Sequence, residues 1–246
     1  MTDGVTEVKY DRFRRATARY MTESVTTKPQ VTLHRGADLT ELDAALQRER
    51  DRVGPRAPGF TAGLLAAIVA GTTSSRVNGT VAEQVISLHD GVDLGVAVDV
   101  DGSLVVPVIR NAQGLSVAEI GSELARLADA ARARRLRPED VGRATFTVTS
   151  LGPLGVEYFT PIVNPPQLAI IGIGAIRDQV AVVDGEIGVR RTIGLSLSFD
   201  HAATDGADAA RALDAITRAI ESPTNLRWVD SVDTSGQLAA PAGTGN

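Results

Sequence analysis

The spacing of apolar and polar residues changes along the chain and predicts strands interleaved with helices. Residues 195–199 (LSLSF) alternate between the two types, which is the period of a half-buried strand, and the alanine-rich run that begins at Ala207 has helical character. Residues 146–150 and 167–173 are expected to be buried strands, the second of them continuously apolar. This alternation predicts an α+β fold with a mixed β-sheet covered by helices.

Other stretches have the period of a helix, and two of them begin with residues that cap helices. Ser116 and Glu119 form a Ser-x-x-Glu capping box, and Asp38 or Thr40 would cap an earlier helix. A third stretch is apolar on all sides, which is typical of a helix inside the core. The helices predicted in this way span residues 10–24, 38–52, 59–71 and 116–135.

Two Asp-Gly pairs predict tight turns. Asp101-Gly102 and Asp184-Gly185 each lie between two apolar runs, which is the strongest short-range signal for a β-hairpin. Further strands are expected at residues 30–36, 84–88, 91–100, 103–109, 179–183 and 187–191. No linker rich in Pro, Gly or Ser divides the chain, so we predict one domain over residues 1–228 and a disordered polar tail over residues 229–246.

Composition narrows the chemistry. The chain of 246 residues has no cysteine, which excludes disulfides, thiolate metal sites and a cysteine nucleophile. Its formal net charge of −5 gives no electrostatic reason to expect nucleic acid or an anionic membrane as a partner. No group of histidines and carboxylates suits a metal, and neither a signal peptide nor a membrane-spanning run is visible. We therefore expect a cytoplasmic protein with no metal, no nucleic acid and no membrane partner.

His201 is the residue whose position suggests catalysis. It lies just past the predicted strand, and Asp205-Gly206 follow where the next helix begins. A rigid strand would aim the imidazole while the carboxylate steadies the turn, an arrangement that suits a general base. The same spacing suits a structural histidine at a strand end, with Asp205 capping the helix. The spacing alone leaves both interpretations open.

Several motifs in a fixed order add specificity. FTVTSLG at 146–152, EYFTPIVNPPQLAIIGIG at 157–174 and LSLSFDHAATDGADAA at 195–210 resemble the catalytic domain of the dihydrolipoamide acyltransferases of 2-oxoacid dehydrogenase complexes. The resemblance begins at RFRRATARYMTES and extends to about Pro223. It implies a chloramphenicol-acetyltransferase-like two-layer fold, whose members form trimers with active sites between subunits.

The resemblance also implies the chemistry of individual residues. His201 would be the general base that takes the proton from an acceptor as the acceptor attacks the thioester of an acyl-CoA. Thr149 would donate to the oxyanion that this attack creates, and Ser150 is the second candidate for that role. Either hydroxyl could instead be an inward-facing group bonded to the backbone.

Other matched positions would shape the site. Asp205 would hold the catalytic loop, with Arg15 or Arg19 of the first helix as a candidate partner for its carboxylate. The helix could equally be an ordinary amphipathic one with solvated arginines. The residues implied to lie near the substrate are Ser150, Phe159, Thr160, Pro161 and Asn164, with His34 on a strand that could border the acceptor pocket. A structural role remains open for each of them.

The sequence departs from the resembled enzymes in three ways. It shows no lipoyl domain, subunit-binding domain or linker; Ala202 stands where the family has an arginine after the histidine; and the chain continues past its last helix as a polar tail. In lacking accessory domains it is similar to the free-standing O-acetyltransferases of tetronate and spirotetronate biosynthesis. This implies a discrete homotrimer that carries no covalent lipoyl group and moves acetyl from acetyl-CoA to a hydroxyl of a small metabolite, such as the primary alcohol of a tetronate.

Two alternatives to that function remain. The chain could transfer acyl groups between CoA and dihydrolipoamide, with a separate protein supplying the lipoyl arm. It could also be a non-catalytic trimeric scaffold, because the change at Ala202 alters the catalytic motif and a fold alone does not guarantee activity. The presence of His201, Thr149 and Asp205 together argues against the scaffold.

Overall fold

The computed structural model describes residue 4 and residues 6–100, 102–183 and 185–228. Its helices are α1 (Arg12–Thr27), α2 (Thr40–Val53), α3 (Phe60–Thr72), α4 (Val117–Arg132) and α5 (Gly206–Glu221). Its strands are β1 (Gln30–Asp38), β2 (Gly79–Ala82), β3 (Val85–Leu88), β4 (Leu94–Val96), β5 (Val98–Val100), β6 (Ser103–Val105), β7 (Val108–Ile109), β8 (Phe146–Ser150), β9 (Ala169–Val183) and β10 (Glu186–Asp200). The predicted tail, Asp101 and Asp184 lie outside the described residues.

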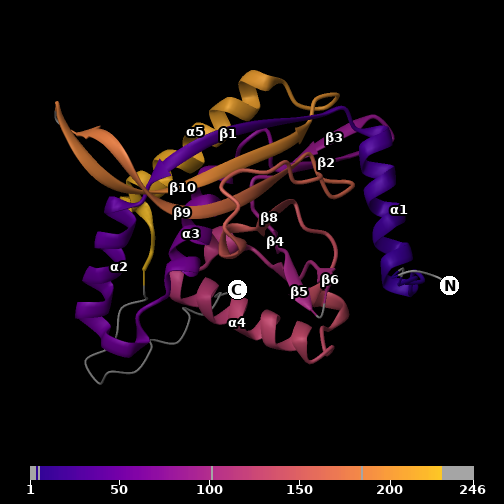
Figure 1. Cartoon of the computed structure of the whole chain (residues 1–246), viewed down its shortest axis with the longest axis horizontal. Helices are drawn as coiled ribbons and strands as arrows, with labels where there is room; N and C mark the ends of the chain where they lie inside the picture. The colour runs from indigo at the N-terminus through magenta and orange to yellow at the C-terminus, as the bar shows by residue number, and fades with distance from the viewer. Residues whose placement is uncertain (1–3, 5, 101, 184, 229–246) are drawn as a thin grey trace, which may run out of the picture.

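A six-stranded sheet in the order β1-β10-β9-β8-β4-β7 forms the centre of the molecule (Figure 1). Strand β8 lies parallel to both β9 and β4, while the remaining neighbours in this sheet pair antiparallel. The sheet is therefore mixed, and the predicted α+β class is confirmed. Two small sheets pair β2 with β3 and β5 with β6.

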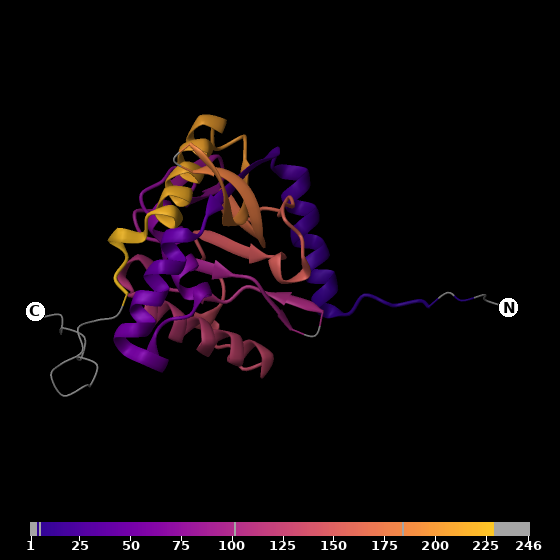
Figure 2. The ribbon, with the colours of Figure 1, turned by 60° about the vertical axis from the view of Figure 1, so that its left-hand side comes forward.

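Helices α2, α3, α4 and α5 cover one side of the sheet, while α1 lies on the other side (Figure 2). Helix α5 packs along β1 and against α3, and α3 packs in turn on α4. Helix α3 is almost wholly buried, as its apolar sequence predicts. A Cβ on Gly71 would lie 2.4 Å from Cα of Ile216, so the close approach of α3 to α5 requires glycine. No helix within the described part of the chain is long and apolar enough to span a membrane.

The predicted capping box at the start of α4 is confirmed, whereas α2 has Leu39, and not Asp38 or Thr40, as its N-cap residue, with no side-chain cap hydrogen bond. The Ser116 side chain accepts from the Glu119 N–H while the Glu119 carboxylate accepts from the Ser116 N–H at 2.7 Å, which is the capping box at the start of α4. At the start of α2, the Asp38 carboxylate accepts from the N–H of Thr40 at 2.8 Å. These local contacts depend only on neighbouring residues, and the sequence alone therefore predicts them.

The second half of strand β10, from Ile193 to Asp200, differs from the predicted half-buried strand because it is buried on both faces. Leu195, Leu197 and Phe199 face the helices and are fully covered, but Ser196 and Ser198 are covered as well. The serine hydroxyls face β1, where Ser198 pairs with Thr32 at 2.7 Å and Ser196 with the His34 ring at 2.9 Å. These hydrogen bonds satisfy the buried hydroxyls.

The chain from 155 to 164 covers this second face of the sheet. A Cβ on Gly174 would lie 1.8 Å from the Glu157 carbonyl oxygen, and a Cβ on Gly194 would lie 2.2 Å from the same atom. Phe159 lies over Gly172 in the same way, with its Cζ 2.6 Å from where a Cβ would be. Glycines on adjacent strands thus allow this segment to pack directly on the sheet.

The hairpin of β9 and β10 is confirmed and is longer than predicted. The strands predicted at residues 167–173 and 179–183 form one continuous strand, β9, which begins at residue 169. The outer part of the hairpin projects beyond the helices (Figure 1). Val180 and Ile187 in this outer part are exposed. The polar residues Arg177 and Asp178, between the two predicted strands, lie where β9 leaves the core and becomes exposed.

Candidate active site

A cleft of about 1060 Å³ lies between α1, the β5–β6 hairpin, the end of β8 and the segment at 159–164. Thr149 and Ser150 come from the carboxyl end of β8, and α1 contributes Thr17, Tyr20 and Met21. Six of the residues predicted from the sequence line this cleft: Thr149, Ser150, Phe159, Thr160, Pro161 and Asn164. A single protomer therefore brings the predicted oxyanion donor and the predicted substrate segment together.

Thr149 and Ser150 differ in how their hydroxyls are used. The Ser150 hydroxyl donates to the Ile173 carbonyl at 3.2 Å, so its donor is already used by the backbone. Thr149 is half-buried in the cleft, and no hydrogen bond to its hydroxyl occurs among the described residues. An oxyanion needs a donor that is not already committed, and Thr149 is the better candidate of the two.

Buried hydrogen bonds hold the segment at 159–164 in place. The Asn164 amide donates to the Thr147 hydroxyl at 3.4 Å, and Thr147 donates to Gln167 at 2.7 Å. The Val163 N–H donates to the Gln30 side chain at 2.9 Å, and the Val163 carbonyl accepts from the Ser24 hydroxyl at 2.5 Å. This wall of the cleft is therefore fixed to β8, to β1 and to the end of α1.

His201 lies outside the cleft, in the turn between β10 and α5. Its ring is exposed and packs against Phe199 with ring centroids 5.4 Å apart. The backbone N–H of His201 donates to the Pro29 carbonyl at 2.9 Å. Asp205 is the N-cap residue of α5, and its carbonyl accepts from the Ala209 N–H at 3.0 Å. The Asp205 side chain makes no capping hydrogen bond, so the proposed helix-capping role of that carboxylate is not observed.

The sheet register separates Thr149 from His201. Thr149 pairs with Gly172, and Gly172 pairs with Ser196 two strands away from β8. His201 lies five residues beyond Ser196, which corresponds to roughly 15 Å along the strand in addition to roughly 10 Å across two strands. Within one protomer, these two side chains cannot contact the same carbonyl group.

The structure also shows an ion pair that the sequence did not reveal. Lys28 Nζ lies 2.7 Å from Asp200 Oδ2, and both side chains are buried. Asp200 stands beside the histidine in the sequence and could have been suspected, but nothing in the sequence marks Lys28 as its partner. The two arginines expected to pair with Asp205 are placed elsewhere: Arg15 donates to the Tyr10 carbonyl, and Arg19 lies over the Tyr20 ring.

His34 is on β1, as predicted, but it does not line the cleft. Besides its bond to Ser196, the ring packs edge-on against Tyr158 with centroids 5.5 Å apart. Tyr158 belongs to the segment that covers the sheet, so the contact between the two rings helps to attach that segment to β1. Its role in substrate binding stays a prediction.

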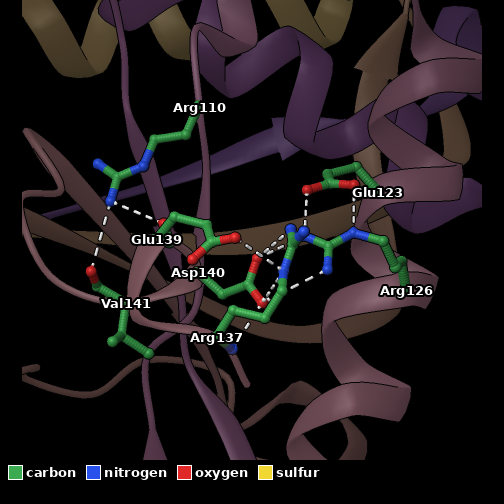
Figure 3. Close-up of polar contacts among 7 residues, drawn as sticks. All are labelled: Arg110, Glu123, Arg126, Arg137, Glu139, Asp140 and Val141. Atoms are coloured by element: carbon green, nitrogen blue, oxygen red, sulfur yellow. Dashed lines mark hydrogen bonds and ion pairs between the residues drawn. The ribbon is translucent and has the colours of Figure 1, made fainter. Parts of the chain in front are cut away.

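A second polar cluster lies at the turn that follows α4 (Figure 3). Asp140 accepts from the guanidinium groups of Arg137 at 3.0 Å and Arg126 at 2.7 Å, and these bonds hold the pKa of Asp140 well below its usual range. Arg126 also binds Glu123 and lowers the pKa of that carboxyl. Across the described residues, no group of histidines and carboxylates is arranged to hold a metal ion.

The chain matches a known enzyme family. The model of the 2-oxoacid dehydrogenases acyltransferase catalytic domain matches residues 2–227, and the chain belongs to this family. It is 39% identical over 226 residues to the dihydrolipoyllysine-residue acetyltransferase component of the acetoin cleaving system of Bacillus subtilis, covering 89% of this chain and 56% of that relative. The chain spans about half the length of the curated relatives that it matches.

Two solved structures share the fold. The dihydrolipoamide acetyltransferase of Azotobacter vinelandii is 32% identical with a TM-score of 0.84, covering 90% of this chain and 93% of that chain. The cubic core of the pyruvate dehydrogenase multienzyme complex is 31% identical with a TM-score of 0.82, with the same coverage. The serine, histidine and asparagine investigated in the catalytic mechanism of the Azotobacter enzyme are separated along its chain by the same intervals as Thr149, His201 and Asp205.

Proposed function

We propose that the protein transfers acetyl groups between CoA and the thiol of a dihydrolipoyl group. His201 takes the proton from the attacking thiol, and the new thiolate forms a bond to the carbonyl carbon of acetyl-CoA. The hydroxyl of Thr149 donates to the oxyanion of the tetrahedral intermediate. When the intermediate collapses, the carbon–sulfur bond to CoA breaks, and the imidazolium of His201 returns the proton to the departing CoA thiolate.

The observation that carries this proposal is the separation of Thr149 from His201 within one chain. Two groups that must act on one carbonyl, yet lie at opposite ends of the sheet, require a second copy of the chain. We therefore propose a homotrimer in which the His201 turn of one protomer faces the cleft of the next. The cubic core matched by this chain shows that the fold is found in a closed assembly.

Asp205 and the cleft residues have supporting roles in this proposal. The exposed Asp205 lies at the end of the same turn as His201, where a contact with the neighbouring protomer would let its carboxylate hold the loop that carries the base. Phe159, Thr160, Pro161 and Asn164 shape the wall along which the acceptor enters. The fixed backbone of that wall favours one orientation of the bound substrate.

The comparisons support a lipoyl thiol as the acceptor better than a tetronate alcohol. The relative from Bacillus subtilis and the enzyme from Azotobacter vinelandii are a dihydrolipoyllysine-residue and a dihydrolipoamide acetyltransferase, and they support acetyl as the group transferred. None of the comparisons reported above supports a tetronate substrate. The primary alcohol expected from the sequence therefore becomes the competing acceptor in the test.

The test is to incubate the purified protein with acetyl-CoA and either dihydrolipoamide or a hydroxymethyl tetronate, and to follow CoA release and product mass. The proposal predicts a thioester with dihydrolipoamide. It also predicts that His201→Ala lowers turnover by about 10²–10⁴-fold with the assembly unchanged, because the ring is exposed. An ester formed only with the alcohol would contradict the proposed acceptor. Absence of transfer to either acceptor would favour the scaffold.

A further inference from the structure

A buried ion pair connects α1 to the turn that carries His201. Lys28 follows the last residue of α1, and its ammonium lies 2.7 Å from Asp200 Oδ2; the two side chains are 6% and 4% exposed. A charge in such surroundings is costly unless a partner compensates it, so each of these two residues requires the other. Asp200 comes immediately before His201 in the chain.

Asp200 holds the backbone of the residues that follow His201. Its second carboxylate oxygen, Oδ1, accepts from the Ala202 N–H at 3.1 Å, and its carbonyl accepts from the N–H groups of Ala203 at 3.1 Å and Thr204 at 2.9 Å. The Thr204 hydroxyl is buried and has no partner among the described residues, so it adds nothing to this hold. The backbone that follows His201 therefore depends on the position of one residue, Asp200.

Pro29, the residue after Lys28, holds the same turn at His201 itself. Its carbonyl accepts from the His201 N–H at 2.9 Å. Helix α1, which ends just before Lys28, lines the cleft with Tyr20 and Met21. Lys28 and Pro29 thus attach the wall of the cleft to the backbone on both sides of the histidine.

We infer that Lys28 is a positioning residue, which sets the direction of the His201 ring by fixing the Asp200 carboxylate. This inference rests on the proposed function, in which His201 is the general base. The ring itself accepts and donates no hydrogen bond within the part of the chain that the structure describes, so its orientation comes from the turn and from Phe199. A ring aimed by its backbone is sensitive to small shifts of that backbone, and a shift of about 1 Å can cost about 10²-fold in rate.

The test compares Lys28→Met with Lys28→Arg and with a control, Arg35→Met, which removes an ion pair with Asp214 at the surface. We expect Lys28→Met to lower kcat by about 10- to 100-fold while KM for both substrates changes by less than about twofold, because the base and not the binding surface is displaced. Lys28→Arg restores most of kcat, since it restores the cation. Arg35→Met leaves kcat unchanged.

A second measurement does not depend on activity. Hydrogen exchange of the Ala202, Ala203 and Thr204 amides should be at least about tenfold faster in Lys28→Met and unchanged in Arg35→Met. If Lys28→Met does not fold, the double variant Lys28→Met with Asp200→Asn removes both charges and serves for the same comparison. Unchanged kcat and unchanged exchange at these amides would overturn the inference, as would a loss that follows the melting temperature alone.

The two proposals can fail separately. Full activity in His201→Ala would refute the role of His201, and the exchange rates would still decide whether Lys28 fixes the turn. A loss of activity in His201→Ala together with full activity in Lys28→Met would leave the proposed function standing and refute the positioning role.

Discussion

Asp200 and Asp140 each hold a turn, but the two carboxylates are neutralised in different ways. Asp200 accepts from the Ala202 N–H and is paired with a single cation, Lys28, that is as buried as itself. Asp140 accepts from the Arg137 N–H and is covered by two arginines that are 40% and 56% exposed. The carboxylate of Asp140 therefore has two partly solvated partners, either of which can serve, whereas the carboxylate of Asp200 has one cationic partner, which is buried with it.

The difference shows what each turn is suited for. A carboxylate with two exposed guanidinium partners tolerates the loss of one, because the other and the solvent remain. A buried pair without a spare partner fixes one geometry and is costly to break. The segment at His201 needs a fixed geometry if its ring is to aim at a substrate held by another protomer, while the turn after α4 only has to connect an α-helix to β8.

The largest effect is expected from Asp200→Asn. This variant leaves the Lys28 ammonium buried without a counter-charge and should lower the free energy of unfolding by about 3–5 kcal/mol. Urea denaturation followed by circular dichroism measures this loss. A loss below about 1 kcal/mol would place the pair among ordinary surface ion pairs and remove the contrast with Asp140.

A smaller and pH-dependent effect is expected from Asp140→Asn. The hydrogen bonds from Arg137 and Arg126 lower the pKa of Asp140 in the folded protein, while in the unfolded chain the group has its usual value of about 4. Its contribution to stability is therefore fully present above that value and is lost as the pH falls through the lower folded pKa. We expect about 1–3 kcal/mol between wild type and variant at pH 7, shrinking steadily below pH 4. A difference that grows on acidification would contradict this assignment.

The smallest effect is expected from Arg126→Met. Arg137 still binds Asp140 in this variant, and the guanidinium of Arg126 is partly solvated. The free energy of unfolding should change by at most about 1 kcal/mol. Thermal unfolding in matched buffers measures it, and a loss as large as that of Asp140→Asn would show that the two arginines do not substitute for one another.

Local features of the fold follow from the sequence. The capping box of Ser116 and Glu119, the hairpins at the two Asp-Gly pairs and the buried helix α3 all depend on residues close together in the chain. The burial of Ser196 and Ser198 could not be predicted in the same way. Their burial depends on the segment at 155–164, some forty residues earlier, which packs on glycines of two different strands. The pattern of apolar and polar residues within one strand holds no information about a segment that covers it.

The candidate site was only partly predictable for the same reason. The six predicted residues that line the cleft lie in two motifs of the resembled family, and the structure brings them together. The distance between Thr149 and His201 depends on strand register, and the partner of Asp200 is Lys28, which lies 172 residues earlier in the chain. Neither relation leaves a periodic or compositional signal in a single sequence.

The shared active site is tested most directly by complementation. His201→Ala and Thr149→Ala are unfolded together in equal amounts and refolded, so that trimers assemble at random. If one protomer supplies the histidine and its neighbour the threonine, about a quarter of the interfaces regain both groups, and about a quarter of wild-type activity should return. The same two proteins mixed after separate assembly are the control. Activity no greater than the mean of the two variants would contradict a site built from two copies of the chain.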